Sequence, residues 1–559
     1  MKKNLILLSL TSLLCVSQGC VERKSQSVTP AISRDSEIEA KVEKVLKGMD
    51  LTEKVGQMIQ LTSSTVTVQG KPEIDPDKLQ KVIGEMKVGS ILNTFADVAQ
   101  SRELTAKLVS EIQKKSMEEI GIPCIYGLDM IHGASYLTDA TFFPQEINLA
   151  ATFNREYARA MGDAMAYETR AAMVPWVFSP VMDLGRNPVW PRHWESFGED
   201  PYLNAEMAVA ETKALQGDDP NHIDDKHVAV SVKHFMAYGV PVSGKDRTPA
   251  LVPENELREK YFRPFKDCLE AGALTLMVNS ASINGIPTHA NKELLTGWVK
   301  NDLDWDGLIV TDWADINNLF ERDHVAKDRK EALAMGINAG IDMIMEPYDP
   351  SCCTELKEVV EAGMIPMSRI DDAVRRVLRL KFRLGLFDNP IWDVSGFDKF
   401  ACKEFQDASY AAAVESEVLL KNEGNILPLE YGKRILVTGP NANSMRSLNG
   451  GWSYTWQGDA DRFAGDYNTI YEALAQKFGE RNVVYEPGVT YDETDRWSTG
   501  AWQKENTPQI AKAVAAASRV DVIVACIGEN SYCETPGNID DLNLSGNQKE
   551  LVKALAKTG

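Results

Sequence analysis

The chain lacks the short motifs of nucleotide-, zinc- and serine-dependent enzymes. Its 559 residues contain no GxxxxGK(S/T) phosphate loop, no GxGxxG after the first predicted strand, no HExxH and no GxSxG. Nine cysteines are too few for a disulfide scaffold, and none is spaced with the seven histidines as a zinc site requires. We therefore expect neither a metal nor a cofactor.

Basic charge is also scarce. The chain has 60 Lys and Arg against 81 Asp and Glu, a formal net charge of −21. Nucleic acids and anionic membranes require basic patches, so this balance argues against both as partners. Neutral polymers and neutral or cationic small molecules remain. The hydrophobic share of 44% is ordinary for a globular protein.

An apolar run long enough to cross a bilayer is also missing. The run Leu5–Val16 follows two lysines and is too short to span comfortably, so it predicts a signal peptide over residues 1–20. The signal ends at Gly19-Cys20, which resembles a bacterial lipoprotein cleavage site. We expect an exported protein, in the periplasm or on the outer membrane through a lipid on Cys20. Simple cleavage and release is the alternative, and the oligomeric state stays open.

Residues 36–388 alternate short apolar runs with longer amphipathic stretches. Runs of this length, rich in Val, Ile and Leu, are typical of strands buried on both faces, and their alternation with helices indicates a parallel sheet. We expect an N-terminal (β/α)8 TIM-like barrel, preceded by helices over residues 36–60. The predicted strands are 88–93, 123–129, 176–183, 228–235, 274–281, 307–313 and 341–346.

Most of these runs carry a polar residue at their C-terminal end. The active sites of β/α barrels lie at that face. The residues in question are Asp129, Asp183, Lys233, His234, Asn279, Asp312 and Glu346.

The pattern changes near residue 388, after a basic amphipathic helix over 376–387. Residues 389–408 are expected to be a linker, and 409–559 a smaller α/β/α sandwich domain. Because the last helix stops just before another strand would follow, we expect this domain to be C-terminally incomplete. We also expect the isolated chain to be less stable or less active than a longer form. The predicted elements are a helix running into a strand over 409–422 and strands at 433–442, 482–489 and 520–529.

Carboxylates and tryptophans remain as the carriers of chemistry. Two carboxylates that flank a cleft are the arrangement that glycoside hydrolysis needs. The chain has 11 tryptophans, whose rings pack against the C–H faces of sugars. Without further evidence, each individual tryptophan is expected to pack in the hydrophobic core.

Seven segments in order resemble glycoside hydrolase family 3, in its two-domain β-glucosidase and exo-β-glucanase branch. The resemblance covers roughly residues 36 to 559. The segments are GLDMIHG (127–133), SPVMDLGRNPVWPRHWESFGEDPYL (179–203), KHFMAYGVPVSGKDRTP (233–249), MVNSASINGIPTHAN (277–291), GLIVTDWADI (307–316), GGWSYTWQG (450–458) and GENSYCET (528–535).

The resemblance implies the catalytic pair. Asp312, in TDW where the family usually has SDW, matches the nucleophile. Glu534, in YCET, matches the acid/base, with Glu529 as its nearest rival. This sequence departs from the family pattern at two positions. Ser280 stands where the family usually has a tyrosine that donates a hydrogen bond to the nucleophile, and Ile283 stands where some relatives have Trp.

The resemblance also implies the sugar-binding residues. Arg192 matches the family arginine that binds the sugar, and Arg186 is the alternative candidate for this role. If Lys233 and Arg247 lie near Asp312, their positive charges would keep its carboxylate ionised. The implied substrate-binding residues are Asp129, Arg192, Lys233, His234, Arg247, Trp313, Trp452 and Trp456.

The activity implied is that of a retaining exo-acting β-glucosidase, which removes terminal non-reducing glucosyl residues from oligosaccharides or β-glucans. A β-xylosidase on the same fold is one alternative, and a non-catalytic glycan-binding surface lipoprotein is another. The single-domain branch that cleaves N-acetylglucosaminides is disfavoured, because the loop MAYGVPVSGKDR after KHF contains no histidine.

Overall fold

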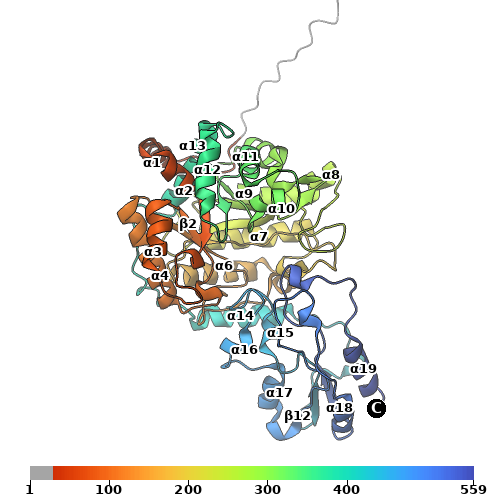
Figure 1. The fold of residues 1–559 in the computed structure, drawn as a ribbon. Coiled ribbons are helices and arrows are strands. Elements are labelled where there is room, and N and C mark those ends of the chain that lie inside the picture. The colour runs from red at the N-terminus through yellow and green to blue at the C-terminus, as the bar shows by residue number, and fades with distance from the viewer. Residues whose placement is uncertain (1–28, 559) are drawn as a thin grey trace, which may run out of the picture.

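The computed structural model describes residues 29–558, so the predicted signal peptide and Cys20 lie outside the described residues. Figure 1 shows two bodies, a larger one from red to green and a smaller blue one. None of the helices in the described range is long and apolar enough to cross a membrane.

The larger body is a parallel barrel, as predicted. Its eight strands follow the order β10-β1-β2-β3-β4-β5-β6-β9, and a parallel bridge between Val310 and Met343 joins the two ends of this order. The strands are β1 (Ile59–Thr62), β2 (Ser90–Leu92), β3 (Ile125–Leu128), β4 (Trp176–Val177), β5 (Ala229–Phe235), β6 (Thr275–Val278), β9 (Leu308–Val310) and β10 (Ile344–Met345).

All seven predicted strand segments of the barrel contain a strand, but the sequence prediction missed β1. The sequence predicts helices over residues 36–60, whereas helix α2 (Leu51–Gln57) ends at Gln57 and only Met58 separates it from β1. A buried segment of four residues cannot be distinguished from the end of a buried helix by periodicity. Pairing with β2 and β10 makes it a strand.

Helices surround the barrel, and a short hairpin of β7 (Ser282–Ile283) and β8 (Ile286–Pro287) follows β6. Side-chain caps begin several of these helices. Asp50, for example, forms a capping box with Glu53 at the start of α2. The remaining helices are α1 (Ser36–Gly48), α3 (Pro76–Leu79), α4 (Arg102–Glu119), α5 (Glu146–Ala151), α6 (Arg155–Arg170), α7 (Pro201–Gln216), α8 (Glu254–Glu256), α9 (Arg263–Glu270), α10 (Asp315–Glu321), α11 (Arg329–Ala339), α12 (Ser351–Glu361) and α13 (Met367–Arg383).

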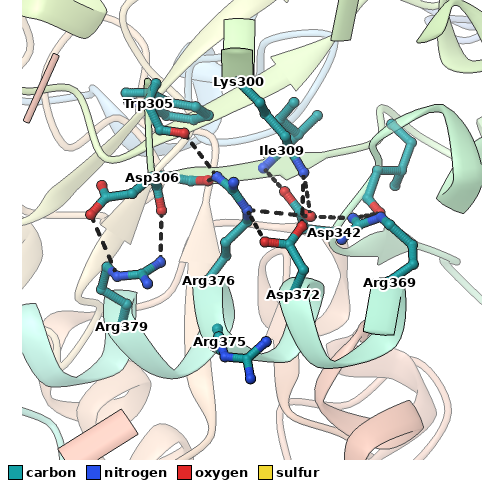
Figure 2. A network of polar contacts seen from close by, with 12 residues as sticks. Lys300, Trp305, Asp306, Ile309, Asp342, Arg369, Asp372, Arg375, Arg376 and Arg379 are labelled. Carbon is teal, nitrogen blue, oxygen red and sulfur yellow. Dashed lines mark hydrogen bonds and ion pairs between the residues drawn. The ribbon is translucent and has the colours of Figure 1, made fainter. Parts of the chain in front are cut away.

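The basic helix predicted near the end of the barrel is α13, and its arginines bind the N-terminal ends of two strands (Figure 2). The buried Asp342 accepts hydrogen bonds from Lys300 Nζ at 2.7 Å and from the Ile309 amide at 2.9 Å, and it also pairs with Arg369. Arg376 donates to the carbonyl of Gly307 at 2.8 Å. The opposite, C-terminal ends of the strands are thereby left for the pocket.

Two buried carboxyl groups lie between α5 and α7. Glu146 accepts a hydrogen bond from the Val181 amide at 3.2 Å, while both carboxyl oxygens of Glu211 lack a hydrogen-bond partner within residues 29–558. Burial and mutual repulsion raise the pKa of Glu146 well above its ordinary value, and burial does the same to the pKa of Glu211.

This pair predicts a pH-dependent stability. The folded state keeps a proton that the unfolded chain releases, so the free energy of unfolding falls as pH rises above the ordinary glutamate pKa. Glu211→Gln should reduce by one the number of protons that the folded state binds in excess of the unfolded state. The dependence of the free energy of unfolding on pH should therefore become shallower by about 1.4 kcal/mol per pH unit between about pH 5 and 7. Denaturant unfolding at several pH values measures it. Glu206→Gln, on the partly exposed side of α7, is the matched control, and equal slopes in all three proteins would contradict the prediction.

The smaller body is an α/β/α sandwich, as predicted. The parallel strands β11 (Ile435–Thr438), β12 (Val483–Tyr485) and β13 (Val522–Ala525) pair in the order β12-β11-β13. Ile435 and Val437 face α17, whereas Leu436 faces α18 and α19, because successive residues of a strand point to opposite faces. The helices are α15 (Met445–Asn449), α16 (Ala460–Phe463), α17 (Ile470–Phe478), α18 (Ile510–Ala517) and α19 (Gly546–Leu555).

The connection between the two bodies differs from the prediction. Helix α14 (Lys403–Ser416) begins inside the segment 389–408 expected to be a linker, and it packs on α5 and α6 of the barrel. The strand expected after it is not formed: residues 417–422 have no regular structure, and Leu420 is exposed. An apolar run becomes a strand only where a neighbour pairs with it, and none of the described strands does.

Candidate active site

A pocket of about 550 Å³ lies at the C-terminal ends of the barrel strands, where loops of the second domain cover it. This volume is in the usual range for ligand sites. The ten residues to which the resemblance assigns catalysis or sugar binding all line the pocket, whereas the strand-end residues Asp183, Asn279 and Glu346 do not. The ten are Asp129, Arg192, Lys233, His234, Arg247, Asp312, Trp313, Trp452, Trp456 and Glu534.

Asp312 follows β9 and presents one free carboxylate oxygen. Its Oδ1 accepts a hydrogen bond from the Trp313 amide at 2.6 Å, and its own amide donates to His289 Nε2 at 3.3 Å. Oδ2 is buried and has no hydrogen-bond partner among the described residues. A carboxylate fixed through one oxygen, with the other unbonded, is suited to attack an atom placed in the pocket.

The departure at Ser280 has a structural consequence. Ser280 Oγ does not bond Asp312; it accepts from Arg247 Nη1 at 2.6 Å and donates to Asp315 Oδ1 at 2.7 Å. Ser280 therefore orients Arg247. Burial alone would lower the pKa of Arg247, but the nearby Tyr238, Asp312 and Glu534 raise it well above its ordinary value. Arg247 accordingly keeps its positive charge beside the two carboxylates.

Glu534 comes from the second domain and reaches the barrel. Its carboxylate lies 3.4 Å from Arg192 Nη1 and 3.3 Å from Arg247 Nη2. Its backbone has a φ of 53°, a conformation that is uncommon for a residue with a side chain and that is often found at functional sites. The rival Glu529 is exposed and does not line the pocket.

The inner end of the pocket is built from charged pairs. Lys233 Nζ donates to Asp129 Oδ1 at 2.6 Å, and Arg192 forms a bidentate pair with Glu195, with its shortest bond at 2.7 Å. Glu195 was not foreseen from the sequence, although it stands three residues after Arg192 in the matched segment. The rival Arg186 is exposed and outside the pocket lining.

His234 is held as a neutral imidazole at the same end. Its Nδ1 lies 2.7 Å from Asp183 Oδ2. Burial, with the positive charges of Arg192 and Lys233 nearby, lowers the pKa of His234 well below its ordinary value. A neutral ring whose Nδ1 is occupied by Asp183 leaves Nε2 for a ligand hydroxyl.

Aromatic side chains form the walls. The Trp452 ring lies 5.4 Å from Lys233 Nζ, and Trp313 and Trp456 stand further out. The sequence reasoning did not identify Tyr348 and Trp497, which also line the pocket. They lie in loops outside the matched segments, so no sequence signal singled them out.

Two loops of the second domain are joined behind Glu534. The Gln457 side chain accepts from the Cys533 amide and donates to the Cys533 carbonyl, both at 3.1 Å. The Cys533 thiol lies 3.3 Å from Glu195 Oε1, and burial, reinforced by Glu195, raises the pKa of this thiol well above its ordinary value. Cys533 thus donates a hydrogen bond to the carboxylate that orients Arg192, and this contact connects the second domain to the inner end of the pocket.

Arg446 binds the same two loops, those of Gln457 and Cys533, through their backbone carbonyls. Its buried guanidinium donates to the carbonyls of Gly458 at 3.1 Å and Ser531 at 3.2 Å, and it pairs with Glu493. Arg446 does not line the pocket. It is therefore a positioning residue for the loop that carries Glu534.

If the pocket hydrolyses β-glucosides, the function proposed below, Arg446→Met should lower kcat for substrates with poor leaving groups by about 10- to 100-fold, because small displacements of a catalytic group are costly. KM should change little, and a dinitrophenyl glucoside, which needs little proton donation, should be spared. Steady-state kinetics on both substrate types measure this. Arg462→Met, at an exposed arginine nearby, is the control; a uniform loss on both substrate types would indicate general unfolding instead.

The residues 29–558 include no group of three or more His, Cys, Asp or Glu side chains that could hold a metal ion. Carboxylates, cationic side chains and aromatic rings line the pocket.

Comparison with known families agrees with this two-domain fold. The Glycosyl hydrolase family 3 N terminal domain matches residues 50–380, and the Glycosyl hydrolase family 3 C-terminal domain matches residues 417–559. The chain belongs to glycosyl hydrolase family 3.

Individual relatives include a lysosomal beta glucosidase of Dictyostelium discoideum, 38% identical over 93% of this chain and 64% of its own length. A periplasmic beta-glucosidase of Salmonella typhimurium is 30% identical over 93% of this chain and 66% of its own length. The chain therefore spans about two thirds of these relatives. An exo-1,3/1,4-beta-glucanase structure from a Pseudoalteromonas species superposes with a TM-score of 0.80 at 28% identity, over 94% of this chain and 81% of that one.

Proposed function

We propose that the protein is a retaining exo-acting β-glucosidase. One observation carries the proposal: Asp312 of the barrel and Glu534 of the second domain line one pocket whose inner end is buried and polar. A pocket closed at one end admits the end of a sugar chain. Pairs of carboxyl groups around a sugar are the machinery of glycoside hydrolysis.

The catalytic cycle follows from the positions of the groups. Lys233, His234 and Arg192 with Asp129 hold the hydroxyls of the terminal sugar, and Asp312 Oδ2 attacks the anomeric carbon. Glu534 protonates the departing oxygen, which leaves a covalent glycosyl-enzyme. Glu534 then takes a proton from water, and the water oxygen displaces Asp312 with net retention of configuration.

Labelling with a 2-fluoro-β-glucoside tests this proposal. Intact mass should show one adduct per chain, and peptide mapping should place it on Asp312. Asp312→Asn should remain unlabelled. A folded wild-type protein that binds β-glucosides and acquires no adduct would contradict the proposal and favour a non-catalytic glycan-binding protein.

A β-xyloside substrate is the second candidate. A beta-xylosidase of Formosa agariphila is 32% identical over 79% of this chain and 62% of its own length. Parallel labelling with the 2-fluoro-β-xyloside compares the two sugars directly. Faster inactivation by the xyloside would overturn the preference for glucose.

We further propose that the protein is exported and carries a lipid on Cys20. The support is the apolar run Leu5–Val16 and the Gly19-Cys20 junction. Radiolabelled palmitate should be incorporated by the full chain in a bacterial host and not by Cys20→Ser. Incorporation by neither protein, with both in the soluble periplasmic fraction, would favour simple cleavage and release.

A further inference from the structure

The pocket continues outward beyond Trp313 and Trp456. Exposure increases steadily along it: Lys233 is 2% exposed and Asp312 7%, whereas Trp497 is 57% and Tyr348 64% exposed. Since the proposed reacting group lies at the buried end, the exposed aromatics face the part of a substrate farthest from the terminal sugar. The gradient of burial therefore gives the order of sugar positions along the pocket.

Two aromatic walls face this outer part, one from each domain. On the second domain, the rings of Trp456 and Trp497 lie 6.0 Å apart with an angle of 37°. On the barrel, Tyr348 packs edge-on against Trp313 with centroids 5.6 Å apart. Each wall thus extends an inner tryptophan with a second, more exposed ring.

The loop that carries Trp497 is held in place before any ligand binds. Asp495 accepts a hydrogen bond from the Trp497 amide at 3.0 Å, and Arg496 pairs with Asp459 at 2.5 Å. The neighbouring Trp502 packs against Tyr532 at 4.4 Å. A large apolar ring fixed in an exposed position buries its face at little entropic cost when a ligand covers it.

A polar group completes the outer part. Asp97 lines the pocket, and its carboxylate makes no hydrogen bond or ion pair with the rest of the described chain. Burial is the main cause that raises the pKa of Tyr348, and the negative charge of the nearby Asp97 raises it further. A free carboxylate beside an aromatic face offers an acceptor for sugar hydroxyls.

We infer that Trp497, Tyr348 and Asp97 form a further aglycone subsite, which binds the sugar unit beyond the one next to the scissile bond. The inference rests on the proposed function and specifies its substrate class: β-linked gluco-oligosaccharides of trisaccharide length or longer, rather than disaccharides or aryl glucosides. Other exposed aromatic residues, such as Tyr202 and Tyr410, are outside the pocket lining.

The test compares chain lengths. We measure kcat/KM for an aryl β-glucoside, a β-gluco-disaccharide and the trisaccharide of the same linkage. The wild type should prefer the trisaccharide to the disaccharide by about three- to tenfold, since aromatic contacts of this kind contribute about that much. Trp497→Ala should abolish this preference, so that kcat/KM becomes the same for the trisaccharide and the disaccharide.

Three further variants sharpen the result. Trp497→Tyr should keep most of the preference, Tyr348→Ala should reduce it, and Tyr202→Ala, on the outer helix α7, should not change it. Equal kcat/KM for the two oligosaccharides in the wild type would overturn the inference while leaving the glucosidase proposal intact. A parallel loss on all three substrates in Trp497→Ala would also overturn it. Failure of the wild type to hydrolyse any of the glucosides would overturn both.

Discussion

Asp312→Asn should lower kcat/KM for every β-glucoside by at least about 10⁴-fold, because the amide carries no negative charge and cannot form the glycosyl-enzyme. The free Oδ2 is the atom lost. The substitution preserves the shape of the side chain and the oxygen that accepts from the Trp313 amide. We therefore expect an unchanged unfolding curve beside an inactive protein, as measured by circular dichroism and steady-state kinetics.

A smaller side chain provides the stereochemical check. Asp312→Gly with added azide should recover turnover of a dinitrophenyl β-glucoside and release the α-glucosyl azide, since the azide enters from the face that Asp312 occupies. Asp302→Asn, at an exposed aspartate ahead of β9, should behave as the wild type. Full activity of Asp312→Asn would refute the assignment of Asp312.

Glu534→Gln should produce a loss that depends on the leaving group. Removing general acid catalysis costs about 10²- to 10⁴-fold where the departing oxygen needs a proton, and much less where it does not. We expect the larger loss on oligosaccharides and a small effect on the glycosylation step with a dinitrophenyl glucoside. Rates across a series of aryl glucosides measure this as a steeper dependence on leaving-group pKa.

Two further results would complete the assignment of Glu534. Azide added to Glu534→Ala should yield the β-glucosyl azide, because azide takes the position of the water that Glu534 activates. Glu529→Gln should leave the dependence on leaving group unchanged, since Glu529 is exposed and outside the pocket lining. The assignment fails if Glu529→Gln, rather than Glu534→Gln, steepens that dependence.

The expected effect of each substitution depends on what the residue contacts. Asp312 and Glu534 contact the reacting atoms in the proposed mechanism, so their loss removes chemistry. Arg446 acts through the loops that it binds, and Trp497 through a distant sugar unit, so their loss changes efficiency selectively. Measurements on all four sites with the same substrate panel would separate chemistry, positioning and recognition.

Much of the fold could be predicted from local pattern. Seven barrel strands and the three strands of the second domain are short apolar runs bounded by turns, and this local pattern predicts a strand. Strand β1 and the segment 417–422 could not be assigned in this way. Both segments follow a helix directly or after one residue. Pairing with β2 and β10 makes Ile59–Thr62 a strand, whereas residues 417–422 pair with none of the described strands, and Leu420 is exposed.

The sequence by itself determined the composition of the site. Through their resemblance to glycoside hydrolase family 3, its motifs indicated the proposed nucleophile, the proposed acid and the proposed sugar-binding residues. All of these residues line the pocket. Their contacts with one another could not be predicted from the sequence, because a motif gives no information on its distance in space from another motif.

Only the tertiary structure decided those contacts. It placed Glu534 between Arg192 and Arg247, diverted Ser280 to Arg247 and Asp315, and brought Trp497 to the mouth of a pocket in the other domain. These are contacts between segments far apart in the chain. They depend on how two independently formed bodies pack together, and that packing is set by many weak interactions summed over the interface rather than by any local pattern.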